Sequence, residues 1–156
     1  DLANAGHRVS LYATDPADIP CIGDLVSAIT DKQAAGRIEH AELKSVADVM
    51  NLMARVDMVI ACRLHGVILS CLMTRPTLAI SYDRKVTARM NDLGMTDWCL
   101  PVDNLDCRRV IALAEKLSNE RQTVSQSLAQ SMHRYRGDLE AHWDRIIGSM
   151  PTIRRV

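Results

Sequence analysis

The chain has 156 residues, of which 47% are hydrophobic and 24% are charged. These proportions are ordinary for a soluble globular domain that buries a core. Lys plus Arg (19) equals Asp plus Glu (19), and aromatic residues make up only 3%, so no nucleic-acid partner is expected. No apolar run approaches the roughly 20 residues that span a bilayer, so no integral membrane segment is predicted.

The beginning of the chain reads as the end of a helix. It opens at Asp1 without a Met, and Gly6 is placed as the glycine that terminates a helix. No signal-peptide pattern is present there. A domain that starts within a helix predicts that the chain is a fragment of a longer protein.

The five cysteines are odd in number and scattered, and none forms a C-x-x-C pair. Neither a zinc knuckle nor a disulfide framework is therefore indicated. Buried, reduced thiols in a cytosolic protein are the interpretation that we prefer. They are Cys21, Cys62, Cys71, Cys99 and Cys107.

Hydrophobic periodicity divides the chain into alternating strands and helices. The predicted strands are 7–13, 37–40, 57–62, 77–81 and 98–100. A first helix begins at Pro16 or Pro20 and ends near Gly36. Ser45 and Asp48 resemble a capping box that opens the next helix. Further helices are expected over 67–73, up to Gly94, and across a helical tail over 104–150, whose long last helix runs over 124–147.

This alternation predicts one α/β domain over 1–156, a doubly wound and mainly parallel sheet with flanking helices. The central strands are continuous apolar runs, which suits a sheet buried on both faces. Ligands of such sheets bind outside the carboxyl ends of the strands. Two polar segments fall at predicted carboxyl ends, 63–66 and 81–85.

The first polar segment, Arg63-Leu64-His65-Gly66, lies between two apolar runs. A strand-to-helix junction offers free backbone N–H groups to an anion, Arg63 adds a planar fork for a carboxylate or phosphate, and His65 can exchange a proton near neutral pH. The structural alternative is that Arg63 pairs with Asp57 or Asp83 while His65 caps the helix. Spacing alone does not choose between them.

In the second segment, Lys85 is a candidate second cation, and Ser81 or Tyr82 would supply hydroxyls. The alternative is a solvated helix start with Asp83 as its N-cap, which we prefer for Arg84. The remaining histidines, His7, His40, His133 and His142, have no metal-ligand spacing and are taken as surface or structural. No metal site is predicted.

Three stretches resemble the polysaccharide pyruvyl transferase family: 57–66 with Arg-Leu-His-Gly, 75–86 with Ile-Ser-Tyr-Asp-x-Lys, and 92–95. The resemblance is specific over about Asp57 to Leu100 and extends to the flanks only as a pattern. One departure is Thr74-Arg75, where the family commonly has a Gly before the Pro-led strand; we expect it to be harmless.

The resemblance implies a Rossmann-like lobe of a two-lobed, GT-B-like architecture, here the carboxyl-terminal donor-binding half, with the amino-terminal lobe absent from this chain. It implies a bacterial, cytoplasmic enzyme of exopolysaccharide or cell-wall glycan biosynthesis, with peripheral attachment at the inner face of the membrane left open. Its members transfer the pyruvyl group of phosphoenolpyruvate to a sugar hydroxyl pair, forming a cyclic ketal.

The resemblance also implies roles for individual residues. His65 becomes the candidate catalytic residue. The candidate donor-binding residues are Arg63, Leu64, Gly66, Ser81, Tyr82 and Lys85. Phosphoenolpyruvate is a substrate and no cofactor is expected; the partners are a saccharide or lipid-linked saccharide acceptor and the amino-terminal lobe. The fragment alone is expected to be inactive.

Two other functions remain open. One is a sugar-nucleotide glycosyltransferase or epimerase of the same architecture, and the other is a non-catalytic anion-binding or assembly module. The last helix carries a second ambiguity, because it could cross towards the other lobe or simply pack on this sheet. An exposed Trp143 would support the crossing.

Overall fold

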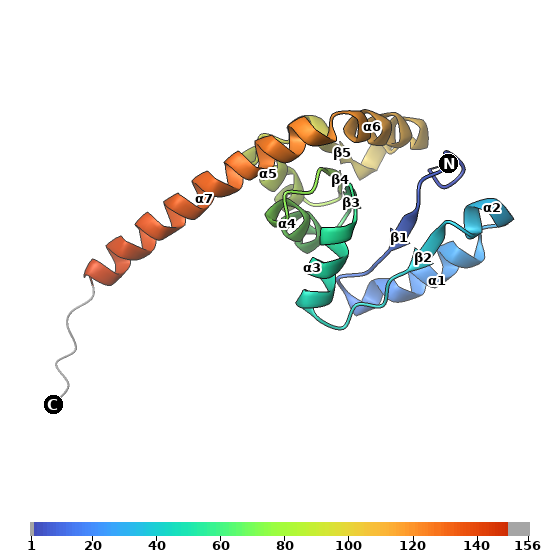
Figure 1. The fold of residues 1–156 in the computed structure, drawn as a ribbon, viewed down its shortest axis with the longest axis horizontal. Coiled ribbons are helices and arrows are strands. Elements are labelled where there is room, and N and C mark those ends of the chain that lie inside the picture. The colour runs from blue at the N-terminus through green and yellow to red at the C-terminus, as the bar shows by residue number, and fades with distance from the viewer. Residues whose placement is uncertain (1, 150–156) are drawn as a thin grey trace.

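The computed structural model describes residues 2–149, so the first residue and the last seven of the predicted lobe lie outside the described residues. The chain is an α/β protein whose parallel sheets are flanked by helices (Figure 1), which confirms the predicted fold class.

The strands are β1 (Val9–Leu11), β2 (Ile38–His40), β3 (Val59–Ala61), β4 (Thr77–Ser81) and β5 (Cys99–Pro101). The helices up to β4 are η1 (Pro16–Asp18), α1 (Ile19–Ser27), α2 (Lys32–Ala35), α3 (Val46–Arg55) and α4 (Leu64–Leu72). After β4 come α5 (Arg84–Asp92), η2 (Thr96–Trp98), η3 (Val102–Asn104), α6 (Cys107–Asn119) and α7 (Arg121–Ser149).

The five strands pair as two sheets instead of the one sheet that we expected. β1 pairs with β2, with Val9 opposite Ile38. β3, β4 and β5 form the second sheet in that order, and both of its pairings are parallel. Figure 1 shows the β1–β2 sheet and its helices set beside the larger unit. No ladder joins β1 to β3 within the described residues, and a cavity lined by residues of both strands lies between them.

The β1–β2 sheet carries two helices where the sequence predicted a single one ending near Gly36. Both prolines occupy first turns, Pro16 in η1 and Pro20 in α1. The helix then breaks after Ser27, and Asp31 starts α2 by accepting hydrogen bonds from the N–H groups of Gln33 and Ala34. The cap at Asp31 therefore fixes where α2 begins.

The β3–β4–β5 sheet contains the core of the molecule. Its central strand β4 is covered on both faces, and Leu78 and Ala79 are fully buried. Helices α4 and α5 connect its parallel strands and contact each other as well as β4. The continuous apolar runs of the sequence therefore correspond to strands buried on both faces, as expected for a parallel sheet.

Local signals at the helix ends agree with the predictions, with one exception. Ser45 and Asp48 form the capping box, in which the Asp48 N–H donates to Ser45 Oγ over 3.1 Å. Gly94 ends α5 with φ of +69°. The exception is Thr74, whose φ of +54° lies in the left-handed region. A β-branched residue is strained there, so the absence of the glycine common in the family is not harmless to the backbone.

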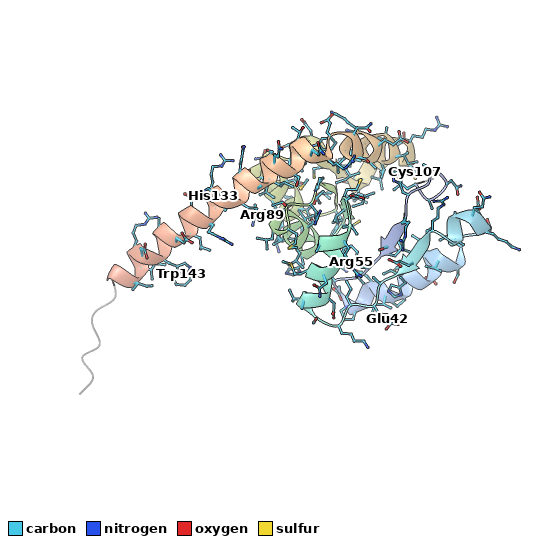
Figure 2. All side chains as sticks on the ribbon, in the orientation of Figure 1. Glu42, Arg55, Arg89, Cys107, His133 and Trp143 are labelled. Carbon is cyan, nitrogen blue, oxygen red and sulfur yellow. The ribbon has the colours of Figure 1, made fainter. Side chains whose placement is uncertain are left out.

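The long helix α7 has two unlike halves. Its first half packs on the core through Val124 and Leu128, whereas Trp143 is 52% exposed on the part that runs away from the rest of the molecule (Figure 2). Where the helix leaves the core, the Tyr135 hydroxyl donates to the Asp92 carbonyl over 3.1 Å. The exposed Trp143 supports the crossing alternative for the second half.

Candidate functional site

The candidate site centres on the junction between β3 and α4. Arg63 is the N-cap residue of α4, with an extended backbone (φ −80°, ψ 138°) and no side-chain cap. The first helical bond from this end runs from the Val67 N–H to the Arg63 carbonyl. The preceding amides of the turn are therefore available at the helix end, where the helix dipole favours an anion.

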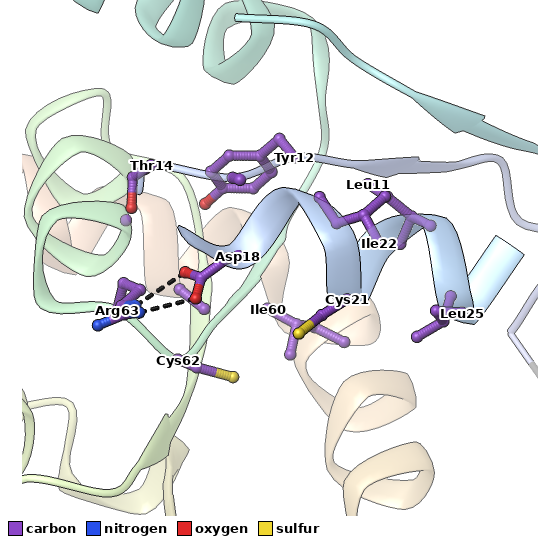
Figure 3. A pocket seen from close by; sticks show the side chains of 13 residues that line it. Leu11, Tyr12, Thr14, Asp18, Cys21, Ile22, Leu25, Ile60, Cys62 and Arg63 are labelled. Atoms are coloured by element: carbon purple, nitrogen blue, oxygen red, sulfur yellow. Dashed lines mark hydrogen bonds and ion pairs between the residues drawn. The ribbon is translucent and has the colours of Figure 1, made fainter. Parts of the chain in front are cut away.

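The Arg63 guanidinium grips a carboxylate with two hydrogen bonds (Figure 3). Its Nε donates to Asp18 Oδ2 over 2.8 Å and its Nη2 donates to Asp18 Oδ1 over 2.7 Å. A second carboxylate, that of Asp15, lies 3.7 Å from Nη2. The hydrogen bond from Arg63 holds the pKa of Asp18 below its usual value, and the same bond raises the pKa of Arg63.

The structure corrects the predicted structural partners of Arg63. Asp57 precedes β3 and so lies at the opposite end of that strand from Arg63. Asp83 is the N-cap of α5 and accepts from the Lys85 backbone N–H over 2.8 Å, as its N-cap prediction required. The partner is instead Asp18, which lies 45 residues before Arg63 in the sequence.

A cavity of about 350 Å³ opens beside this pair, between β1, α1 and β3. Its polar side carries Asp18 and Arg63, while its other wall is apolar (Figure 3). The apolar wall includes Leu11, Ile22, Leu25 and Ile60. The junction thus combines an anion-binding fork with an adjoining apolar hollow.

Tyr12 lines the same cavity and was missed by the sequence reasoning, which assigned it only to a strand. Burial, with a smaller effect of Cys62, raises the pKa of Tyr12 to about 12, so its phenol is neutral near pH 7. Its hydroxyl lies 3.0 Å from the point where a Cβ on Gly66 would stand. Gly66 therefore leaves space for the close approach of Tyr12.

The second polar segment meets Arg63 through one residue only. The Tyr82 hydroxyl accepts from Arg63 Nη1 over 3.4 Å, and the guanidinium carbon lies 5.9 Å from the centre of the Tyr82 ring. Ser81 is buried and bonds locally, with its Oγ donating to the Asp83 carbonyl over 2.9 Å. The Lys85 side chain is exposed and has no hydrogen bond or ion pair within residues 2–149. Arg63 and Tyr82 are thus brought together, whereas Ser81 and Lys85 make no hydrogen bond with Arg63 within the described residues.

His65 and Leu64 occupy the first turn of α4. Leu64 is half-buried and packs against the core, while His65 is exposed. The His65 side chain makes no hydrogen bond within the described part of the chain, and Arg63 is the N-cap residue of α4, so the alternative in which His65 caps the helix is wrong. An unengaged imidazole beside the helix end is accessible to a bound substrate.

Other predicted features are distributed over the surface. His7, His40, His133 and His142 are exposed, as expected. Within residues 2–149 no group of three or more His, Cys, Asp or Glu side chains could hold a metal ion. The prediction of buried thiols is wrong for Cys21, Cys62 and Cys107, which are exposed because they lie on helix surfaces and strand ends. Across the same residues, no helix has the length and apolar content needed to cross a membrane.

Comparison with known families places this junction in context. Residues 11–84 match the family model described as polysaccharide pyruvyl transferase. This segment, a little under half of the chain, is similar to the polysaccharide pyruvyl transferase family. The family predicted from the Arg-Leu-His-Gly turn is thereby confirmed. No curated protein and no solved structure matches the chain.

The pyruvyl transferase segment contains nearly all of the candidate site. It runs from β1 to the first residue of α5 and includes every residue that lines the cavity beside Arg63. Of the predicted site residues, Lys85 alone falls beyond it, by one position. The segment reaches further towards the amino end than the resemblance over Asp57 to Leu100 indicated, and so it brings Tyr12 and Asp18 into the family region.

Proposed function

We propose that this protein takes part in the transfer of a pyruvyl group from phosphoenolpyruvate to two hydroxyls of a sugar, forming a cyclic ketal. The observation that carries the proposal is that Arg63 binds a carboxylate with two hydrogen bonds, within the segment that matches the pyruvyl transferase family. Phosphoenolpyruvate bears a carboxylate and a phosphate, and a guanidinium fork matches either group.

The geometry supports separate roles for a small number of residues. Arg63 would bind one acidic group of the donor, and the free amides at the start of α4 would bind the other. Tyr82 already contacts the guanidinium and would fix its orientation. Lys85, exposed one residue into the helix α5, would balance remaining negative charge once the donor is bound.

In the proposed reaction His65 exchanges protons with the donor and the acceptor. A proton is added to the methylene carbon of phosphoenolpyruvate, which becomes a methyl group and leaves an oxocarbenium-like centre at the adjacent carbon. One sugar hydroxyl adds to that carbon and loses its proton. The C–O bond to phosphate then breaks, a second hydroxyl adds and loses its proton, and the phosphate leaves with a proton. One cyclic pyruvate ketal, with a methyl group and a carboxylate on its ketal carbon, and one inorganic phosphate result.

The test uses the full-length protein with phosphoenolpyruvate and candidate sugar acceptors, followed by phosphate release and by detection of the ketal. His65→Ala should lower turnover by roughly 100- to 10,000-fold, the usual contribution of a general acid or base. His133→Ala, which removes an exposed imidazole from α7, is the matched control and should leave turnover unchanged. Near wild-type turnover in His65→Ala would remove His65 from the mechanism.

A second pair of variants tests the donor site. Arg63→Lys should weaken phosphoenolpyruvate binding severely, because an ammonium keeps the charge but cannot form the planar fork. Arg84→Lys makes the same change at an exposed position nearby and should have no effect. A requirement for a nucleotide sugar in place of phosphoenolpyruvate would instead favour the glycosyltransferase alternative.

A further inference from the structure

Two units of the chain meet at Arg63. Residues 2–42 contain β1, β2, α1 and α2, and residues 43–149 contain the β3–β4–β5 sheet and its helices. Within these described residues, every hydrogen bond and ion pair between the two units ends on the Arg63 side chain, with Asp18 or Asp15 as the partner. The residue proposed to bind the donor is therefore also the polar link between the units.

Asp18 occupies Arg63 in the manner expected of a substrate carboxylate. Its two oxygens face Nε and Nη2 at 2.8 and 2.7 Å. Asp15 adds a second negative charge 3.7 Å from the same nitrogen. A dissolved anion that approaches Arg63 must displace one carboxylate and overcome repulsion from another.

The segment that carries Asp18 contributes no side chain to the buried core. Neither η1 nor α1 contains a buried residue. The side chains of Asp18 and Arg63 keep 34% and 41% of their surfaces exposed, so solvent and small anions can reach the pair. Opening the pair would thus expose little additional apolar surface.

We propose that Asp18 is an intramolecular competitor for the donor anion at Arg63, and that binding of the anion breaks the Asp18–Arg63 pair and releases η1 and α1 from the β3–α4 junction. The identity of the anion as phosphoenolpyruvate rests on the proposed function, but the competition does not. Exposed ion pairs close with equilibrium constants of roughly 1.4 to 5, so Asp18 should weaken anion binding about two- to sixfold.

The competition is tested by titrating the chain with three probes: phosphoenolpyruvate, inorganic phosphate and pyruvate. Asp18→Asn keeps the shape of the side chain and removes its charge, and it should bind the anion at Arg63 about two- to sixfold more tightly than the wild type. Asp24→Asn makes the same charge change at an exposed position on α1 and should alter affinity by less. In an Arg63→Ala background, Asp18→Asn should give no gain, because the competition acts only through Arg63.

The outcomes distinguish the proposed competition by Asp18 from the proposed use of phosphoenolpyruvate as the donor. Tighter phosphate binding by Asp18→Asn, without a preference for phosphoenolpyruvate, would support the competitor and count against the proposed donor. Equal or weaker phosphoenolpyruvate binding by Asp18→Asn would overturn the competitor while leaving the donor site in place. The competitor would also be overturned if none of the three anions bound to either the wild type or Asp18→Asn. A guanidinium fork that is vacated by Asp18 should accept an anion.

Discussion

The two sheets of this molecule differ in what holds them in place. In the β3–β4–β5 sheet, side chains such as Leu78 are fully buried, and the connecting helices pack against one another. Beside the β1–β2 sheet, helix α1 contains no buried residue, and Leu25 on it is 51% exposed. The contrast indicates that apolar burial stabilises the first unit, whereas the second meets it through the Arg63–Asp18 pair and the packing of Tyr12 against the core. A ligand that competes for that pair can alter the second unit without disturbing the first.

The largest expected effect tests this contrast in burial. Leu78→Ala should lower the free energy of unfolding by about 2–5 kcal/mol, because it removes buried apolar surface and leaves a cavity. Leu25→Ala makes the same chemical change on α1 and should lower it by about 0.5 kcal/mol or less. Urea denaturation of both variants measures the difference. Similar losses at the two positions would show that α1 contributes to the core as β4 does.

A smaller effect is expected at the contact between the units. Gly66→Ala would place a Cβ 3.0 Å from the Tyr12 hydroxyl and 3.3 Å from the Ala61 Cβ. Because the hydroxyl is the far end of a long side chain, part of the overlap can relax, and we expect a loss of about 1 kcal/mol of unfolding free energy. At Gly137 on α7 a new Cβ would meet open space. Gly137→Ala should therefore raise the unfolding free energy by about 0.5–1 kcal/mol.

A double variant distinguishes the Tyr12 contact from other causes. Tyr12→Phe removes the hydroxyl that the new Cβ would meet, so it should restore most of the stability lost in Gly66→Ala. Thermal or urea unfolding of the two single variants and the double variant gives the coupling between the positions. If the losses of the single variants simply add, the strain lies elsewhere, for example at Ala61.

The sequence predicts well those parts of the fold that depend on local pattern. The apolar run of β3 and β4, the capping box at Ser45 and the glycine end at Gly94 are all signals within a few residues, and each agrees with the structure. The break between α1 and α2 was missed because the apolar spacing runs on to Ile29, beyond the end of α1 at Ser27, and the N-cap at Asp31 was not recognised.

The candidate site could be predicted only in its local parts, the Arg63 turn and the Tyr82 loop. Arg63 is recognisable as a charge between two buried runs, and the family resemblance supplied a function for it. Its partner could not be found in this way, because Asp18 is 45 residues away in sequence and reaches Arg63 only through the placement of η1. Tyr12 was missed for the same reason, since its role depends on the space left by Gly66. Contacts between separate units carry no periodic signal.

The smallest expected effect, a response to acid, sharpens the comparison between the two units. The pKa of Asp18 is lowered from its usual 3.8 by its hydrogen bond from Arg63. A carboxyl with a lowered pKa in the folded state stabilises that state above its unfolded pKa, and the contribution is lost as the pH falls through the lowered pKa. The link between the units should therefore be intact at neutral pH and weaken below about pH 4, whereas the apolar core has no such dependence.

The Arg63 Nε–H resonance in an NMR titration reports the link directly, since this group donates to Asp18. It should shift below about pH 4 in the wild type, while amide resonances of β4 stay unchanged until the whole chain unfolds. In Asp18→Asn the shift should be reduced, because the replacement does not titrate and only the more distant Asp15 carboxylate remains beside Arg63. If β4 resonances change together with that of Arg63, the two units unfold as one, and the distinction between a packed unit and a charge-linked unit does not hold.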